Sequence, residues 1–422
     1  MKKGPTGLLL PFFIGLTYPD TIPYRYAGAI RISTKPVIRY NMAEATVSRY
    51  ESLDVLKGFI IIVVVCGHLM VTSTGSESDR ALPIAMQIMY LGLMSFFIIS
   101  GYFYRPGRGF VENIKRRGTQ LLVALVICAV VLPVITYVWL AILGQSSDPS
   151  DIVDAILKAL YLSDLFMPMG PTDSYIACST CVGYYFLWSM MGGFLIFYGL
   201  ADRIMNDWRK FTVTITVLLV AYMLFVEFWP VRLPFFFQIA PLAALFMFAG
   251  ALLAKYRFVE KVEVFAWRSL SYWLPCIICL VAGVVLCIIF PPGIKFDWAI
   301  FGDYGGLSII PFMIASLLMF VVFVYVAKLV AKLPLLPKLL NLSGQHTMGL
   351  LLYHGFVATM ILAPFYVIPT TSWFPVMGLT NRIVTAVAVI VICLVICVYG
   401  PKVIEKVRGR CSADKDKTGE GL

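Results

Sequence analysis

Long runs of apolar residues alternate with short polar segments along the whole chain. Ten of these runs have about the ~20 residues that a helix needs to cross the hydrocarbon layer of a membrane. They cover roughly 55–74, 82–103, 119–143, 180–200, 211–229, 235–254, 270–290, 307–328, 346–366 and 382–400. The runs at 211–229 and 235–254 are separated only by Trp229–Pro234, so a broken or re-entrant unit is an alternative there. The pattern predicts an all-α, polytopic membrane protein built as a bundle of about ten transmembrane helices.

Composition and charge agree with this fold class. Hydrophobic residues make up 60% of the chain and charged residues only 14%, which excludes an ordinary soluble domain. Lys and Arg collect in alternate connections, whereas the opposite ones are acidic or neutral, most clearly at 148–173. Because basic residues mark the cytoplasmic side, both termini are predicted to be cytoplasmic. The net charge of +11 therefore reflects membrane topology, and we expect membrane lipids but no nucleic acid as partners.

The chain divides into one membrane domain and two polar ends. Residues 1–50 are predicted to be a cytoplasmic arm, although a start at Met42 would remove most of it, and 402–422 a disordered cytoplasmic tail. Residues 51–401 form the membrane domain. The long external connection includes Asp151–Tyr161, whose apolar residues have helical spacing. This segment is expected either to lie on the membrane surface or to cap the bundle.

Ten cysteines are present, and most lie singly within apolar runs, where Cys behaves as a small hydrophobe. Cys178 and Cys181 differ because they fall at the external mouth of the fourth predicted helix. A local disulfide, a metal pair and free thiols all remain open for them. One CxxC pair without a second pair or a nearby His is weak evidence for zinc, so no metal is expected.

The first predicted helix contains two ionisable residues, Lys57 and His68, eleven positions apart. Eleven steps of about 100° return to within ~20° of the starting direction, and Asp54 lies within about 60° of the same stripe. Ionisable groups at membrane depth are costly and usually functional. Structural alternatives remain: His68 as a packing residue, Lys57 as a snorkelling anchor, and Asp54 as its counter-ion or as an N-terminal helix partner.

Four motifs occur in an order that resembles the membrane acyltransferase type 3 family. Leu53–His68 is similar to the family's Leu-Asp-x-x-Arg/Lys, followed after ten residues by His. Ser95–Tyr102 resembles its Phe-Phe-x-x-Ser-Gly-Phe, and Arg105–Arg108 its Arg-x-x-Arg. Leu342–His354 resembles its Gly-x-x-Ser-x-x-x-Tyr-x-x-His, with Thr347 in place of Ser and Leu351 in place of Tyr. The glycines beside Lys57 and His68 look most like the branch of fucose 4-O-acetylases.

The resemblance implies transfer of an acetyl or other short acyl group from acyl-CoA to a hydroxyl of a cell-surface polysaccharide or lipid-linked sugar. It implies a multi-pass protein of the plasma (inner) membrane, with His68 as the catalytic base. The positive charges expected to hold the phosphates of acetyl-CoA are Lys57, Arg105, Arg108, Lys115, Arg116 and Arg117. Ser100, Tyr353 and His354 are possible supporting residues, with helix packing as the alternative. The thioester is already activated, so the chemistry requires no metal.

Lys57 lies about three helical turns from His68, so the two side chains cannot share a hydrogen bond. They are expected to line one continuous cavity, in which the donor enters from the cytoplasm and meets the acceptor near His68. A secondary transporter or flippase for a lipid-linked sugar is the alternative function, and it predicts paired discontinuous helices and an inverted repeat. A purely structural or receptor role leaves Lys57 and His68 unexplained.

Overall fold

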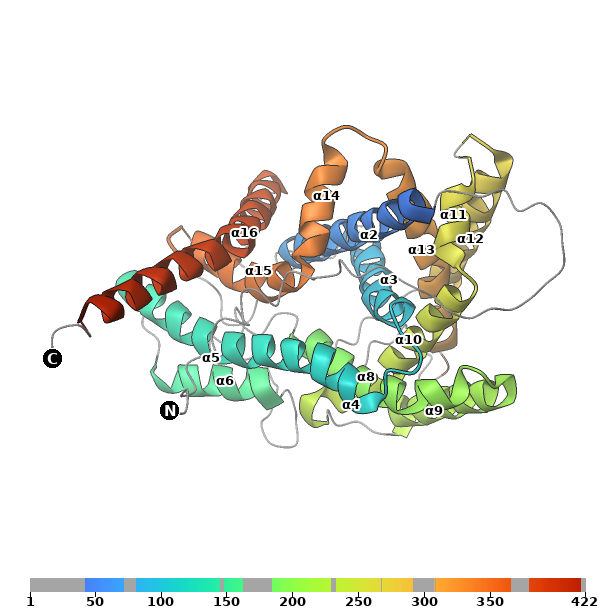
Figure 1. The fold of residues 1–422 in the computed structure, drawn as a ribbon, viewed down its shortest axis with the longest axis horizontal. Coiled ribbons are helices and arrows are strands. Elements are labelled where there is room, and N and C mark those ends of the chain that lie inside the picture. Colours follow the sequence, from blue (N-terminus) through green and yellow to red (C-terminus); the bar gives the residue numbers. More distant parts are fainter. Residues whose placement is uncertain are drawn as a thin grey trace.

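The computed structural model describes residues 42–71, 81–144, 148–161, 184–228, 233–266, 268–290, 307, 309–365 and 379–418. Every secondary-structure element in these ranges is a helix (Figure 1), so the predicted all-α membrane fold is confirmed. Each of the ten predicted spans falls on a helix. Within the described ranges, seven helices are long and apolar enough to cross a membrane, and 91–102 and 347–362 form shorter apolar helices.

The helices that correspond to predicted spans are α2 (Met42–Val71), α3 (Ala81–Tyr102), α5 (Thr119–Ile142), α8 (Tyr184–Ile204), α9 (Trp208–Phe228), α10 (Ala240–Lys255), α12 (Leu270–Ile289), α13 (Ile309–Val330), α15 (Thr347–Leu362) and α16 (Leu379–Thr418). The connecting elements are α4 (Phe110–Asn113), the π-helical turn η1 (Ile114–Gly118), α6 (Ser150–Tyr161), the 3-10 turn η2 (Pro234–Ile239), α11 (Phe258–Val264) and α14 (Leu336–Gln345).

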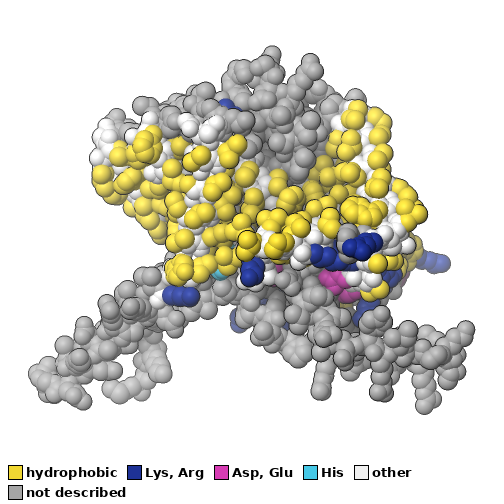
Figure 2. All heavy atoms as spheres, turned by 90° about the horizontal axis from the view of Figure 1, so that it is seen from above, with side chains coloured by type: hydrophobic (Ala, Val, Ile, Leu, Met, Phe, Trp, Pro, Cys, Tyr) yellow, Lys and Arg dark blue, Asp and Glu magenta, His cyan; other side chains and the backbone are white. Residues whose placement is uncertain are grey.

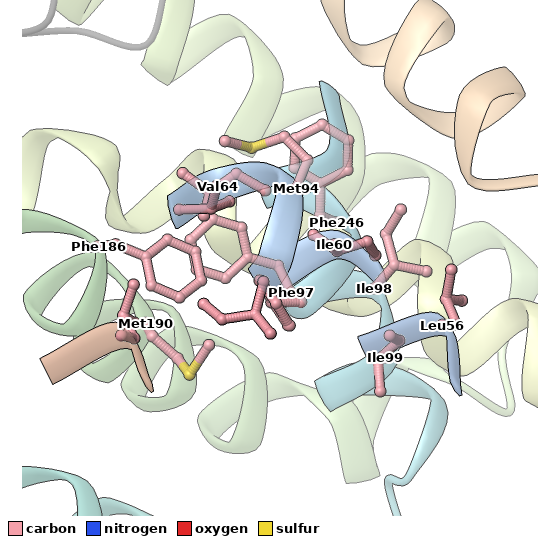
Figure 3. Close-up of a cluster of buried hydrophobic side chains, with 14 of the residues drawn as sticks. Leu56, Ile60, Val64, Met94, Phe97, Ile98, Ile99, Phe186, Met190 and Phe246 are labelled. Atoms are coloured by element: carbon pink, nitrogen blue, oxygen red, sulfur yellow. The ribbon is translucent and has the colours of Figure 1, made fainter. Parts of the chain in front are cut away.

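The centre of the molecule is formed by α2, α3, α8 and α10. Figure 3 shows Leu56 of α2 beside Ile98 and Ile99 of α3, and Ile60 beside Phe246 of α10; Phe97 of α3 and Phe186 of α8 belong to the same buried cluster. The rings of Phe97 and Phe186 stack with centroids 4.7 Å apart. By contrast, α9 and α12 expose rows of large apolar side chains, as expected for helices that face lipid. α9 and α10 are separate helices, and the 3-10 turn η2 directly precedes α10.

Two helix crossings bring backbone directly against backbone at glycines. A β-carbon added at Gly58 of α2 would lie 1.8 Å from the carbonyl oxygen of Leu340 in α14, and one added at Gly344 would lie 1.8 Å from that of Asp54. Figure 1 shows α14 crossing α2 steeply at this place. Gly101 of α3 and Gly250 of α10 form a second reciprocal crossing. A β-carbon added at either glycine would lie 1.9 Å from a carbonyl oxygen of the other helix. Small residues permit such close approach of membrane helices.

The ends and the external connection add details to the predicted domains. α2 begins at Met42, within the segment assigned to the arm, and α16 continues to Thr418 through most of the segment assigned to the tail. Residues 1–41, with Cys178 and Cys181, lie outside the described ranges. The expected external helix is α6, and its Ala155 is buried with Leu140 of α5 and Ala363. This packing favours a cap on the bundle over a helix on the membrane surface.

The surface seen in Figure 2 is a broad hydrophobic belt. Most of the Lys and Arg side chains visible there lie along one edge of the belt. A belt with basic residues gathered at one edge is the distribution expected of a membrane protein whose basic edge faces the cytoplasm.

Candidate functional site

His68 lies in the last turn of α2, at the C-terminal end of its apolar part. Its Nδ1 is 2.9 Å from the carbonyl oxygen of Val64, one turn earlier. Because a carbonyl only accepts hydrogen bonds, this contact requires Nδ1 to carry the proton. In the neutral imidazole the other ring nitrogen, Nε2, carries the lone pair and is the atom that accepts a proton.

His354 of α15 lies beside His68, with ring centroids 5.0 Å apart and planes inclined by 43°. Its side chain is buried, and its Nδ1 lies 3.0 Å and 2.9 Å from the carbonyl oxygens of Leu350 and Leu351. The same reasoning places the proton on Nδ1. Its Nε2 is enclosed and has no hydrogen-bond partner among the described residues. The bundle thus brings together two imidazoles with basic Nε2 atoms from helices far apart in sequence.

Lys57 forms an ion pair with Asp54, with 2.5 Å between Nζ and Oδ1. Asp54 lies three turns inside α2, which begins at Met42, so the structure supports the counter-ion interpretation over the helix-terminus one. The side chains of Lys57 and Asp54 are 15% and 23% exposed. Removing either one would leave the charge of the other largely buried without its counter-ion, which is costly. Eleven residues of helix place this pair roughly 16 Å from His68 along the axis.

The stripe between Lys57 and His68 is occupied by Ile61 and Val64. Their exposed fractions are 0% and 1%, so neighbouring helices pack directly against this part of α2. The continuous cavity expected along the stripe is therefore closed at this level in the structure. A pantetheine arm that joins the two positions has to pass beside these side chains or displace them.

The predicted phosphate-binding residues lie on the connection between α3 and α5. Arg105 and Arg108 belong to the loop after α3, and Arg116 and Arg117 to η1. Arg108 pairs with Glu112 at 3.5 Å, and Glu112 is largely exposed, so this surface pair stabilises the loop little. These side chains lie on the same connection, at the end of α3 that the charge pattern assigns to the cytoplasm.

The short helix α11 ties the ends of α2 and α3 together, a contact that the sequence did not predict. Tyr102 of α3 donates a hydrogen bond to Glu260 at 2.5 Å, and Ser52 of α2 donates one to Glu263 at 2.7 Å. Lys328 of α13 donates to three carbonyl oxygens at the end of α11, at 2.6, 2.9 and 2.7 Å. Such a lysine satisfies carbonyls that a helix end leaves unpaired. α11 therefore fixes the helix ends that flank Lys57 and Arg105.

The remaining candidates have structural partners. Ser100 donates to the carbonyl oxygen of Phe96 in its own helix at 2.8 Å. The Tyr353 hydroxyl and the Cys128 thiol of α5 form a hydrogen bond. These contacts favour the packing interpretation for both residues. Among the supporting candidates, His354 is the one whose ring lies against His68.

A comparison with protein families shows which family the chain belongs to. A family model described as an acyltransferase domain matches residues 50–400, a range that includes both histidines, the Lys57–Asp54 pair and the arginine loop. The chain belongs to the membrane acyltransferase type 3 family. No curated protein and no solved structure matches the chain significantly. The protein is thus a multi-pass membrane acyltransferase, which favours an enzyme over the transporter or receptor alternatives.

For a membrane acyltransferase, the arrangement separates two tasks. Neutral imidazoles can move the proton of a hydroxyl acceptor; His354 is buried, and His68 lies partly buried beside it. Cationic side chains suited to an anionic donor lie at the basic edge. α2 carries Lys57 from the cationic group and His68 from the imidazoles. The helix therefore fixes the distance between these two residues.

Proposed function

We propose that this membrane acyltransferase moves an acetyl or other short acyl group from acyl-CoA to a hydroxyl of a cell-surface polysaccharide or a lipid-linked sugar. The plasma (inner) membrane is the proposed location, and the glycines beside Lys57 and His68 resemble those of the fucose 4-O-acetylase branch. The observation that carries the proposal is the contact of His68 with His354. It supports the proposal because two imidazoles that can accept a proton lie in a bundle whose Lys- and Arg-rich edge suits a phosphorylated donor.

In the proposed reaction the hydroxyl oxygen of the acceptor attacks the carbonyl carbon of the thioester. A C–O bond forms and the C–S bond breaks, while the hydroxyl proton passes to Nε2 of His68. The imidazolium then gives this proton to the departing sulfur, which leaves as the CoA thiol. The base is restored, and no oxidant, reductant or metal is consumed.

His354 supports this cycle by being a neutral neighbour. When His68 accepts the proton, a second charge 5.0 Å away would repel it strongly in a medium of low dielectric constant. The backbone contacts of His354 fix Nδ1 as a donor, so in the neutral ring the lone pair is on Nε2. His354 is therefore proposed as a positioning and electrostatic partner of His68.

The activity itself can be tested by mass analysis of surface glycans from cells with and without the protein. The proposal expects an acetyl or succinyl increment that is lost when the protein is absent and restored by the wild-type chain. Purified protein with acetyl-CoA labelled in the acetyl group should release CoA thiol only when a carbohydrate acceptor is added. Glycans of unchanged mass would contradict the proposed acceptor class.

Replacing Arg105 and Arg108 together by Lys is expected to weaken CoA binding more than it alters the apparent affinity for the acceptor. The charge is kept, but Lys cannot make the bidentate contact with phosphate that a guanidinium makes. Titration of CoA into purified protein measures the effect. Arg209→Lys is the matched control, because Arg209 lies in the first turn of α9, outside the arginine loop. Unchanged CoA affinity in the double variant would leave both arginines with a role in topology only.

A further inference from the structure

Asp202, in the last turn of α8, binds the loop that carries Arg105 and Arg108. Its Oδ1 accepts a hydrogen bond from the hydroxyl of Tyr104 and a second from the backbone N–H of Gly107 at 3.1 Å. Tyr104 directly precedes Arg105, and Gly107 directly precedes Arg108. One carboxylate oxygen therefore holds the loop at a point beside each arginine.

The loop has a shape that depends on these anchors. Gly107 and Gly109 have φ of +80° and +70°, in the left-handed region that favours glycine. Nothing lies within 4 Å of a β-carbon added at either position, so packing around them does not define the turn. Tyr104 packs the loop against α8 instead, because the centroids of its ring and that of Phe197 are 5.3 Å apart.

The chemistry of the pair keeps it intact. Burial of the ring and the Asp202 carboxylate raise the pKa of Tyr104 above its ordinary value. The hydroxyl therefore keeps its proton and remains a donor at any physiological pH. The charged oxygen of Asp202 accepts hydrogen bonds from two donors. An acidic residue whose charge is engaged in this way is compatible with the anion site proposed beside it.

We infer that Asp202 is a positioning residue that holds the loop so that Arg105 and Arg108 face the phosphates in the nucleotide part of the donor. This inference rests on the proposed use of acyl-CoA. A guanidinium binds phosphate through a planar fork, so the direction of the side chain matters as well as its charge. A loop without its anchor samples other directions, and binding has to restrict it again.

The test compares two donors, acetyl-CoA and S-acetylpantetheine, which carries the same thioester without the nucleotide. Asp202→Ala is expected to raise the KM for acetyl-CoA about tenfold, the effect of losing a hydrogen bond to a charged group. Its kcat is expected to change little. With S-acetylpantetheine, Asp202→Ala and the wild type should have the same KM, because this donor makes no contact with the arginines.

Two further variants separate positioning from charge. Asp202→Asn keeps a side-chain oxygen that can accept both bonds, so it should restore most of the affinity for acetyl-CoA. Tyr104→Phe removes one bond, and adding it to Asp202→Ala should cause no further loss, because coupled residues are not additive. Asp207→Ala is the matched control. Asp207 lies between α8 and α9, but it accepts hydrogen bonds from the backbone N–H groups of Arg209 and Lys210.

The outcomes distinguish this inference from the proposed function. If the wild type used both donors with equal KM, the arginine loop would not bind the nucleotide, and the proposed donor site would fail. If the wild type preferred acetyl-CoA but Asp202→Ala left its KM unchanged, only the positioning role would be wrong. An equal rise for both donors would also overturn it. Should Asp202→Ala fail to fold, Gly107→Ala tests the same loop, because it strains φ without a clash, and it should raise the KM for acetyl-CoA alone.

Discussion

His68→Ala is expected to reduce acyl transfer by about 10²–10⁴-fold, the usual contribution of a positioned general base. The hydroxyl of a sugar is a poor nucleophile unless its proton is removed as the C–O bond forms. In the structure, the Val64 carbonyl fixes a proton on Nδ1 of His68, so in the neutral ring Nε2 is the nitrogen that accepts another. Acetyl-CoA turnover by purified protein with a carbohydrate acceptor measures the loss.

His346→Ala is the control for the loss of a buried histidine from this bundle. The chain has three histidines, and His346 lies at the junction of α14 and α15, buried and eight residues before His354. Activity per folded molecule should stay near that of the wild type. His354→Ala should fall between the two, since it removes a neighbour of the base and not the base itself. Near-full activity of His68→Ala, with loss of activity in His354→Ala, would move the catalytic role to His354.

Features set by local pattern could be predicted from the sequence. The apolar runs located the helices, because a helix in hydrocarbon must be apolar over about 20 residues. The period of the α-helix placed Asp54, Lys57 and His68 on one stripe of α2. The motif at 342–354 also pointed to His354. Each of these conclusions depends on residues within a few turns of one another.

Contacts between distant helices could not be predicted. Tyr104 and Asp202 are 98 residues apart, and Ser52 and Glu263 are 211 apart, so no spacing rule relates them. Asp202 and Glu263 belong to none of the motifs found in the sequence. The expected cavity along α2 was wrong at Ile61 and Val64, because the stripe analysis considered one helix and not the helices that pack against it. Side-chain packing between helices decides whether such a stripe is open.

The α14 segment shows the same limit. Residues 336–345 were too polar to be predicted as a span, yet α14 packs across α2 near the Lys57–Asp54 pair. The glycine that follows Lys57 in the family-like motif had no assigned role in the sequence. The structure gives it one, because Gly58 and Gly344 are where the two helices meet.

Gly58→Ala and Gly344→Ala are each expected to destabilise the protein strongly. An added β-carbon would lie 1.8 Å from a carbonyl oxygen of the opposite helix, and a backbone atom cannot rotate away as a side chain can. Overpacking a tight contact usually costs about 1–3 kcal/mol, occasionally more. Here relief requires α2 and α14 to separate, so we expect at least the upper part of that range. Thermal unfolding of the purified protein and the yield of monodisperse protein measure the loss.

Gly92→Ala is the matched control, because Gly92 lies in α3 of the same bundle. A β-carbon there would meet only side-chain atoms of Ile60 and Phe323, at 3.6 and 3.7 Å, which is ordinary contact distance. This variant should keep its unfolding temperature and its activity. Separation of α2 from α14 would also move Lys57 and Asp54, so any Gly58→Ala protein that folds should bind CoA more weakly than Gly92→Ala. Equal stability of the Gly58 and Gly92 variants would show that the two helices do not cross at this glycine pair.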